Sequence, residues 1–214
     1  MRAILLANSQ LNPSDTLADE LHSGELLIAA DGGGQHCLNL GLSPDIVVGD
    51  FDSLAPEALK QLAAGGARIV RHDTRKDETD LELALRLACD AGADDIIMFA
   101  ALGNRWDMTL ANLLLAAQAE FLDSRITLVD GAQRISLLKP GATHTLTGRT
   151  GDTLSLIPLA GDVSGIRTDG LEYPLEGETL HFGSPRGVSN VFLTTKATVF
   201  FEEGLLLAVQ IQQR

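Results

Sequence analysis

The sequence contains few cysteines and little positive charge. Its 214 residues include two cysteines, and 16 Lys and Arg residues stand against 29 Asp and Glu residues, which gives a formal net charge of −13. Cys37 and Cys89 lie singly in helix-like segments, without a CxxC pair or a nearby histidine, so we expect small buried side chains rather than disulfide or zinc ligands. Because so acidic a surface repels phosphates, the composition argues against a nucleic-acid-binding protein.

Long apolar runs are missing as well. No stretch approaches the roughly 18 residues that a membrane-spanning helix needs. The run Ala3–Ala7 is too short for a signal peptide before the polar Asn8. We therefore expect a cytoplasmic protein without a membrane partner. The hydrophobic fraction of 45% is ample for a globular core.

The first part of the chain alternates short apolar runs with helical stretches. The runs predict strands over residues 3–7, 26–30, 46–48, 68–70, 95–101 and 126–129, and the stretches between them predict helices over residues 16–21, 35–40, 56–63, 80–91 and 107–121. Continuous apolar strands alternating with helices are typical of a parallel sheet covered on both faces. The pattern predicts an α/β domain over residues 1–130.

The sequence pattern changes near residue 131. Thr153–Ile157 and Val191–Thr195 alternate with a period of two, and glycines recur between such segments without a convincing helix. Short strands with frequent turns indicate an antiparallel sandwich or barrel. We therefore expect a second domain over residues 131–214.

The segment Gly49-Asp50-Phe51-Asp52-Ser53 directly follows the apolar run Ile46–Val48, where a buried strand is expected to end. Two carboxylates one residue apart repel each other unless a positive charge lies between them. A hard cation such as Mg²⁺ accepts a few oxygen ligands and keeps some of its waters. Aspartate is also favoured in ordinary turns, so the motif alone fits either a turn or a metal site.

Two further clusters follow neighbouring strands. Asp31-Gly32-Gly33-Gly34 combines glycines, which allow close backbone approach, with a helix start that can bind an anion, although three glycines also make a simple turn. Thr79 and Glu82 form a capping-box pattern that places Asp80 in the first turn of a helix. Asp80 also suits the helix dipole without any ligand. Lys76 is the candidate phosphate contact.

A fourth cluster surrounds the start of the last predicted helix of the α/β domain. Arg105 can grip phosphate oxygens, and Asp107 lies at the helix N-terminus, where it can also act as a cap. Met108 and Asn112 share one face, and Trp106 is either a packing residue or a rim for a planar ligand. The predicted buried face consists of Leu110, Leu113, Leu114 and Ala117.

The clusters are more informative together than singly, because the carboxyl ends of parallel strands form the ligand-binding edge of such sheets. Asp31, Asp50, Asp52 and Asp80 would gather several negative charges in one crevice, which a divalent cation makes tolerable. Lys76 and Arg105 would flank it. The set indicates a Mg²⁺-nucleotide complex and phosphoryl or pyrophosphoryl transfer.

These residues resemble the thiamine pyrophosphokinase family. The matching segments span nearly the whole chain and are Ala30-Asp31-Gly32-Gly33, Gly49-Asp50-Phe51-Asp52-Ser53, Lys76-Asp77 with Thr79-Asp80, Gly103-Asn104-Arg105 with Asp107 and Asn112, and Gly187-Val188-Ser189-Asn190. The pair of GDFDS and K-D-x-T-D is the most specific part of the resemblance.

The resemblance implies an N-terminal α/β catalytic domain, a C-terminal β-sandwich that binds thiamine, and a homodimer with active sites in clefts shared between subunits. It implies an enzyme that transfers pyrophosphate from ATP to thiamine, with Mg²⁺ as cofactor. The implied Mg²⁺ ligands are Asp50, Asp52 and Asp80, and the implied catalytic residues are Asp52, Asp80, Arg105 and Asp107. The implied binding residues are Asp31, Gly32, Gly33, Lys76, Thr79, Arg105 and Asn112 for the metal-nucleotide complex, and Ser189 and Asn190 for thiamine.

Two positions depart from the family's common pattern. Met108 stands where His is often found, and a thioether cannot transfer a proton. Asn104 stands in place of Gly. These departures bear on substrate specificity, so two alternatives stay open: a pyrophosphokinase for another alcohol such as a pterin, and a catalytically silent sensor of thiamine or nucleotide.

Overall fold

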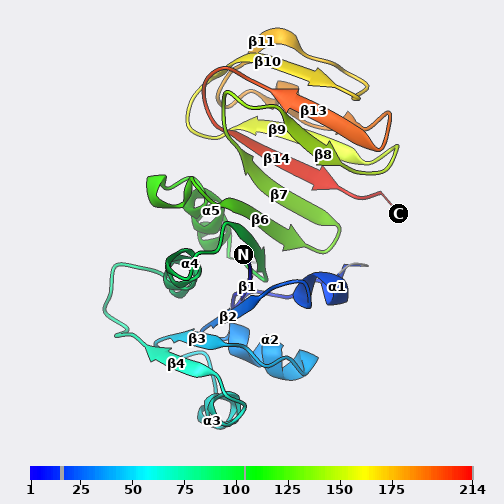
Figure 1. Ribbon diagram of the computed structural model, residues 1–214. Helices are drawn as coiled ribbons and strands as arrows, with labels where there is room; N and C mark the ends of the chain where they lie inside the picture. The colour runs from blue at the N-terminus through cyan, green and yellow to red at the C-terminus, as the bar shows by residue number, and fades with distance from the viewer. Residues whose placement is uncertain (15–16, 104, 214) are drawn as a thin grey trace. The chain divides into compact units, whose positions relative to one another are not determined.

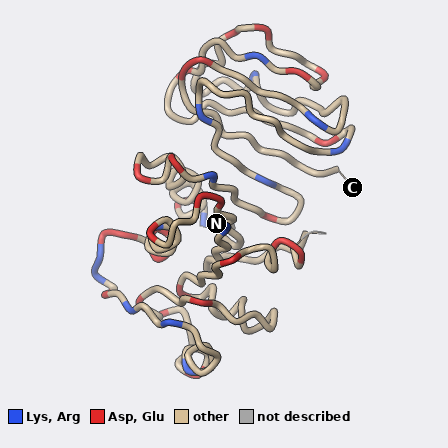
Figure 2. Tube along the Cα trace, viewed as in Figure 1, with Lys and Arg blue, Asp and Glu red and all other residues tan. Residues whose placement is uncertain are grey.

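The computed structural model describes residues 1–14, 17–103 and 105–213 (Figure 1). The chain divides into two compact units, Met1–Gly131 and Ala132–Arg214. Each unit has its own hydrophobic core. Acidic residues occur along both units (Figure 2).

The first unit is built on a parallel sheet. Its strands are β1 (Arg2–Leu6), β2 (Leu26–Ala30), β3 (Ile46–Gly49), β4 (Arg68–Arg71), β5 (Asp95–Phe99) and β6 (Arg125–Asp130), arranged in the order β6-β5-β1-β2-β3-β4. Its helices are α1 (Leu17–Leu21), α2 (Gly33–Leu40), α3 (Pro56–Ala64), α4 (Asp80–Asp90) and α5 (Trp106–Leu115), followed by the 3₁₀ turn η1 (Ala119–Phe121). The predicted α/β class is confirmed.

The apolar strands lie in the middle of a layered structure. Ile4, Leu5 and Leu6 of β1 are fully buried, because helices α2 and α4 pack against β1 and β2 from opposite sides (Figure 1). The chain runs outward from β1 to β4 and then crosses back through α4 to β5, on the other side of β1. The strand order therefore reverses between β1 and β5, and ligands of open α/β sheets bind at such a point.

Helix α5 differs from its prediction. It ends at Leu115 instead of continuing to Phe121, and it exposes Leu110 and Leu114, which the sequence pattern had placed on the buried face. The predicted face was wrong because the helix is apolar on most sides, so periodicity could not select one. The side that packs inward carries Thr109 and Asn112, whose polar atoms bond to the main chain of the preceding loop.

The second unit is a sandwich of two antiparallel sheets, as predicted. One sheet contains β7 (Gln133–Leu138), β9 (Thr153–Pro158), β12 (Asn190–Val191) and β14 (Leu206–Ile211), in the order β12-β9-β14-β7. The other contains β8 (His144–Thr147), β10 (Val163–Asp169), β11 (Glu176–Leu180) and β13 (Lys196–Phe200), in the order β11-β10-β13-β8.

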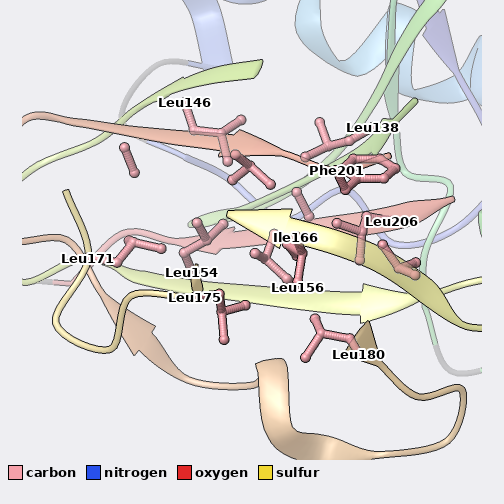
Figure 3. Close-up of a cluster of buried hydrophobic side chains, with 14 of the residues drawn as sticks. Leu138, Leu146, Leu154, Leu156, Ile166, Leu171, Leu175, Leu180, Phe201 and Leu206 are labelled. Carbon is pink, nitrogen blue, oxygen red and sulfur yellow. The ribbon is translucent and has the colours of Figure 1, made fainter. Parts of the chain in front are cut away.

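Alternating side chains fill the space between these two sheets. Leu154 and Leu156 of β9 point into the same buried cluster as Ile166 of β10 and Leu206 of β14 (Figure 3). The strand predicted over residues 191–195 is reduced to the two-residue β12, preceded by the 3₁₀ turn η2 (Pro185–Gly187). Of the helices in the described parts of the chain, none combines the length and the apolar character needed to cross a membrane.

Candidate active site

A cavity of about 330 Å³ opens at the carboxyl ends of the parallel strands in the first unit. It lies at the point where the strand order reverses, because β1, β2, β3 and β5 all contribute the residues that follow them. The lining residues are Ala7, Asn8, Ser9, Ala30, Asp31, Asp50, Asp52, Ser53, Thr79, Asp80, Leu81, Ala100, Ala101, Arg105, Met108, Thr109 and Asn112.

Three carboxylates meet at one end of this cavity. Asp31, Asp50 and Asp52 each offer an oxygen, and these oxygens lie within 4.8 Å of one another. Asp31 is buried, and among the described residues nothing hydrogen-bonds to its Oδ1 atom. A buried carboxylate oxygen without a donor, facing two more carboxylates, suits a hard divalent cation.

The electrostatics of Asp31 follow from this crowding. Burial raises the pKa of its carboxyl above the ordinary value, and the nearby Asp80 and Asp52 carboxylates act in the same direction. Like charges in a poorly solvated site disfavour each other's ionised form. A bound cation would remove that penalty, so the residues present fit a metal ion.

The backbone at the strand ends is unusual. Asp31, Phe51 and Ala100 follow β2, β3 and β5, and all three have left-handed φ angles, of 45°, 62° and 52°. Such angles are uncommon for residues with a Cβ atom and collect at functional sites. At β3, the left-handed Phe51 points its ring into the core, while Asp50 and Asp52 line the cavity.

The glycines after Asp31 have a packing role. A Cβ atom on Gly32 would lie 1.9 Å from the Asn8 side chain, and one on Gly33 would lie 2.0 Å from the carbonyl oxygen of Leu6. Neither glycine lines the cavity. They let α2 start close against β1, and their predicted contact with a ligand stays a prediction.

Helix α4 begins as its capping pattern predicts. The Thr79 hydroxyl accepts a hydrogen bond from the Glu82 amide at 3.2 Å, and this cap places Asp80 at the cavity wall. Asp80 lies outside the cluster of three carboxylates. Its Oδ1 atom instead receives a hydrogen bond from Lys76 Nζ at 2.8 Å, so the predicted metal ligand and the predicted phosphate contact form an ion pair.

The start of α5 carries the second cation of the site. Arg105 lines the cavity and donates to both carboxylate oxygens of Asp107, from Nε at 3.0 Å and from Nη2 at 2.5 Å. Both side chains are exposed. This bidentate hydrogen bond, helped by the Met108 amide, lowers the pKa of Asp107 to about 2. Asp107 is therefore ionised throughout the neutral range.

Further along α5, Asn112 and Met108 both line the cavity, as expected from their spacing. The Asn112 amide donates to the carbonyl of Ala101 at 2.6 Å, which joins the helix to the end of β5. Trp106 points outward and is 81% exposed, so it is not a core residue of this unit. Asn104, the other departure from the family pattern, lies outside the described residues.

Ser189 and Asn190 belong to the second unit. Ser189 has a left-handed φ of 63°, and its amide donates to the buried Ser155 hydroxyl at 3.0 Å. The Asn190 side chain accepts from the amide of Tyr173 at 3.0 Å and donates to its carbonyl at 2.7 Å. Asn190 thus fixes the segment that presents the exposed Tyr173 ring, beside a smaller cavity that both residues line.

Sequence reasoning did not single out Asn8, Ser9 and Thr109, which also line the main cavity. Asn8 and Ser9 follow β1, the strand at the reversal of the sheet order. Their position after the first apolar run was the available signal, but a polar pair at a strand end looks like any loop. The Asn8 side chain approaches Asp31 Oδ2 at 3.5 Å.

Comparisons with known proteins cover both units. Residues 17–128 match the family described as "Thiamin pyrophosphokinase, catalytic domain", and residues 143–206 match "Thiamin pyrophosphokinase, vitamin B1 binding domain". A thiamine pyrophosphokinase of Bacillus subtilis is 28% identical over 185 residues, which are 86% of each chain.

Solved structures agree in fold over the full length. The thiamine pyrophosphokinase structure from Bacillus subtilis superposes with a TM-score of 0.88 at 27% identity and covers all of both chains. The structure from Geobacillus thermodenitrificans gives 0.85 at 28% identity and covers 100% of this chain and 98% of the other.

Proposed function

The chain belongs to the thiamine pyrophosphokinase family, and we propose that it transfers the pyrophosphoryl group of ATP to the hydroxyethyl oxygen of thiamine, giving thiamine diphosphate and AMP. One observation carries the proposal. The cavity lined by four aspartates lies where the strand order of the parallel sheet reverses, in a chain that matches both domains of this family. Residues 1–130 would form the catalytic domain and residues 131–214 the thiamine-binding domain.

Mg²⁺ is the proposed cofactor. Asp31, Asp50 and Asp52 would hold it, with Asp80 beside them. Their converging oxygens support this assignment, as does the Asp31 Oδ1 atom, which has no donor among the described residues. When bound, such an ion offsets charge on phosphate oxygens and on the leaving group. This assignment keeps Asp50 and Asp52 from the sequence prediction and adds Asp31 as a ligand. It places Asp80, the third predicted ligand, beside the cluster, where it pairs with Lys76.

The two cations of the site are proposed to hold the phosphate chain. Arg105 and Asp107 are both exposed, so Arg105 can leave Asp107 and bind phosphate oxygens without breaking a buried ion pair. Lys76 is nearly buried against Asp80, and it adds positive charge beside the acidic cluster. Both residues would keep the β-phosphorus in line with the attacking hydroxyl.

Asp107 is proposed to orient the thiamine alcohol. Arg105 lowers the pKa of Asp107 in the free site, and a carboxylate that has lost this partner is still a weak base at neutral pH. Asp107 would therefore accept a hydrogen bond from the hydroxyl rather than remove its proton early. In the reaction, a bond forms between the hydroxyl oxygen and the β-phosphorus while the bond between the β-phosphorus and the α,β-bridging oxygen breaks. The hydroxyl proton passes to solvent as AMP leaves. Positioning and charge stabilisation supply most of the acceleration.

The second unit is proposed to contribute the thiamine contacts. Ser189 and Asn190 remain the proposed contact region, although the Asn190 amide is already engaged with the Tyr173 main chain. The exposed ring of Tyr173 offers an aromatic surface of the kind on which the pyrimidine of thiamine can stack.

A homodimer with shared active sites is also proposed, in a cytoplasmic enzyme. Trp106, Leu110 and Leu114 are spaced four residues apart on α5 and are 81%, 57% and 43% exposed. We call them the α5 stripe. A helix face of this kind is unfavourable in water, and it starts beside the cavity-lining Arg105. A second copy that covers the stripe would lie next to the site.

The test is acceptor-dependent release of AMP under saturating Mg-ATP, with thiamine and a pterin alcohol compared side by side. The proposal predicts AMP with thiamine and background release with the pterin. AMP with the pterin alone would replace the acceptor, and tight thiamine binding without AMP would make the protein a sensor.

A further inference from the structure

The turn that carries two of the proposed metal ligands is destabilised by charge repulsion and by a left-handed backbone angle. Asp50 and Asp52 bring their carboxylates together with that of Asp31, and these charges repel one another. Phe51 between them adopts a left-handed backbone at φ 62°, which is disfavoured for a residue with a Cβ atom. Within the turn, the Asp52 amide donates a hydrogen bond to Asp50 Oδ1 at 3.1 Å, and contacts from outside the turn add to this support.

Arg71 supplies two such contacts. It is the last residue of β4 and pairs in register with Gly49, the residue immediately before the turn. Its Nη1 atom donates a hydrogen bond to the main-chain carbonyl of Asp50 at 2.9 Å. Its guanidinium carbon also lies 4.7 Å from the ring centroid of Phe51, which is a cation–π distance. The Arg71 side chain thus contacts both the main chain just before Phe51 and the Phe51 ring.

The direction of these contacts matters for the cavity. Arg71 donates to the Asp50 carbonyl, and Phe51 is 8% exposed within the core cluster that includes Leu54 and Leu62. The ring is thereby fixed on the side away from the cavity, while Asp50 and Asp52 line the cavity. The hydrogen bond from Arg71 ends on the main-chain carbonyl of Asp50, so it does not use the carboxylate oxygens of Asp50 or Asp52.

We propose that Arg71 is a positioning residue for divalent-cation binding: it locks Phe51 in the left-handed conformation and so preorganises the Asp50 and Asp52 carboxylates. This inference rests on the proposed function, because it assumes that these carboxylates bind the metal ion. A merely structural Arg71, which only covers the Phe51 ring, would affect thermal stability and leave cation affinity unchanged.

The experiment titrates the full-length protein with Mn²⁺ alone, a spectroscopic probe for Mg²⁺ sites, and measures free Mn²⁺ by electron paramagnetic resonance. Arg71→Met keeps an apolar chain over the Phe51 ring but removes the charge and the donor, and the dissociation constant should rise about tenfold. Arg71→Lys keeps the charge without the planar fork, so its constant should fall between those of the wild type and Arg71→Met.

Two variants make the result specific. Arg68→Met removes the arginine at the other end of β4 and should bind Mn²⁺ within about twofold of the wild type, because substitutions that share no partner with a site act independently of it. Asp52→Asn should abolish binding at the site. Arg71→Met that binds like the wild type, or Arg68→Met that is equally impaired, would overturn the role of Arg71. Equal binding by Asp52→Asn and the wild type would instead overturn the metal site itself.

Discussion

At the residue scale, the site depends on carboxylates that are placed where they repel one another. Asp31, Asp50 and Asp52 converge at the ends of two neighbouring strands, β2 and β3. The buried Asp31 gains no hydrogen bond at Oδ1 from the described residues. Without a cation, this arrangement destabilises the folded protein, and a bound cation would relieve the repulsion. Local strain of this kind collects at functional sites.

Replacing Asp52 with Asn should separate binding chemistry from folding. The amide keeps the size of the side chain but removes one charge from the acidic cluster, so turnover should fall by about 100-fold, the usual scale for one electrostatic group. The Mg²⁺ concentration needed for half-maximal rate should rise as well. Initial rates at varied Mg²⁺ measure both effects, and thermal unfolding checks the fold. Near-normal activity would remove Asp52 from the metal site.

The pH dependence of the reaction should not come from Asp107. Arg105 lowers the pKa of Asp107 to about 2 in the free site. If Arg105 turns to the phosphates, that pKa returns toward the ordinary aspartate range, which still lies well below pH 6, so the carboxylate form persists over the pH range tested. Asp107→Asn should therefore lower kcat by a similar factor from pH 6 to pH 9. A pH–rate profile of the two proteins tests this. A variant that removes the acidic limb of the profile would show that Asp107 titrates in the reaction.

The sequence located these carboxylates better than their partners. A residue that follows an apolar run falls at a strand end, and the four aspartates of the predicted acidic set, Asp31, Asp50, Asp52 and Asp80, line the cavity. The fifth predicted aspartate, Asp107, is not among the lining residues. The ion pair of Lys76 with Asp80 and the contact of Asn190 with Tyr173 could not be predicted in the same way. Partner choice among polar side chains depends on three-dimensional distances that spacing along the chain does not contain.

At the element scale, the two helix starts at the site differ in how they are fixed. Helix α4 has a side-chain cap at Thr79, whereas the N-cap residue of α5, Arg105, makes no capping hydrogen bond with its side chain. The α4 start is therefore set by local sequence, and the capping box predicted it correctly. The inward face of α5 is set by two side-chain bonds to the end of β5 and its loop, so apolar periodicity gave the wrong face.

Removing the α4 cap should weaken the first unit by a defined amount. Thr79→Ala leaves the Glu82 amide without its acceptor and should destabilise the protein by about 1 kcal/mol. For a chain of this size that lowers Tm by roughly 2–4 °C. Thr79→Ser keeps the hydroxyl and should retain most of the stability. Equal Tm values for the Ala variant and the wild type would show that the cap contributes nothing.

At the scale of the whole molecule, the α5 stripe is an apolar surface beside the site that a single chain leaves exposed. Trp106 and Leu110 are the most exposed members of this apolar face, next to an otherwise acidic site. If a second copy covers the stripe, the dimer and the active site share one structural element. The oligomeric state then becomes a functional property of the enzyme.

Leu110→Glu should convert the protein to a monomer. A charge placed in the α5 stripe would be buried without a partner in the dimer, which is strongly unfavourable. Leu40→Glu is the matched control, because Leu40 on α2 is 42% exposed but lies outside the stripe. Sedimentation equilibrium should report a monomer for the first variant and a dimer for the control. A dimeric Leu110→Glu protein would place the interface elsewhere.

The most direct test of the central claim is the fate of the phosphoryl groups in one reaction mixture. Thiamine carrying ¹⁸O in its hydroxyethyl group is incubated with Mg-ATP, and the products are followed by ³¹P NMR and mass spectrometry. Attack of the alcohol on the β-phosphorus predicts equal amounts of AMP and thiamine diphosphate, with the ¹⁸O retained between carbon and phosphorus and none in AMP. ADP with thiamine monophosphate, or no product at all, would contradict pyrophosphoryl transfer.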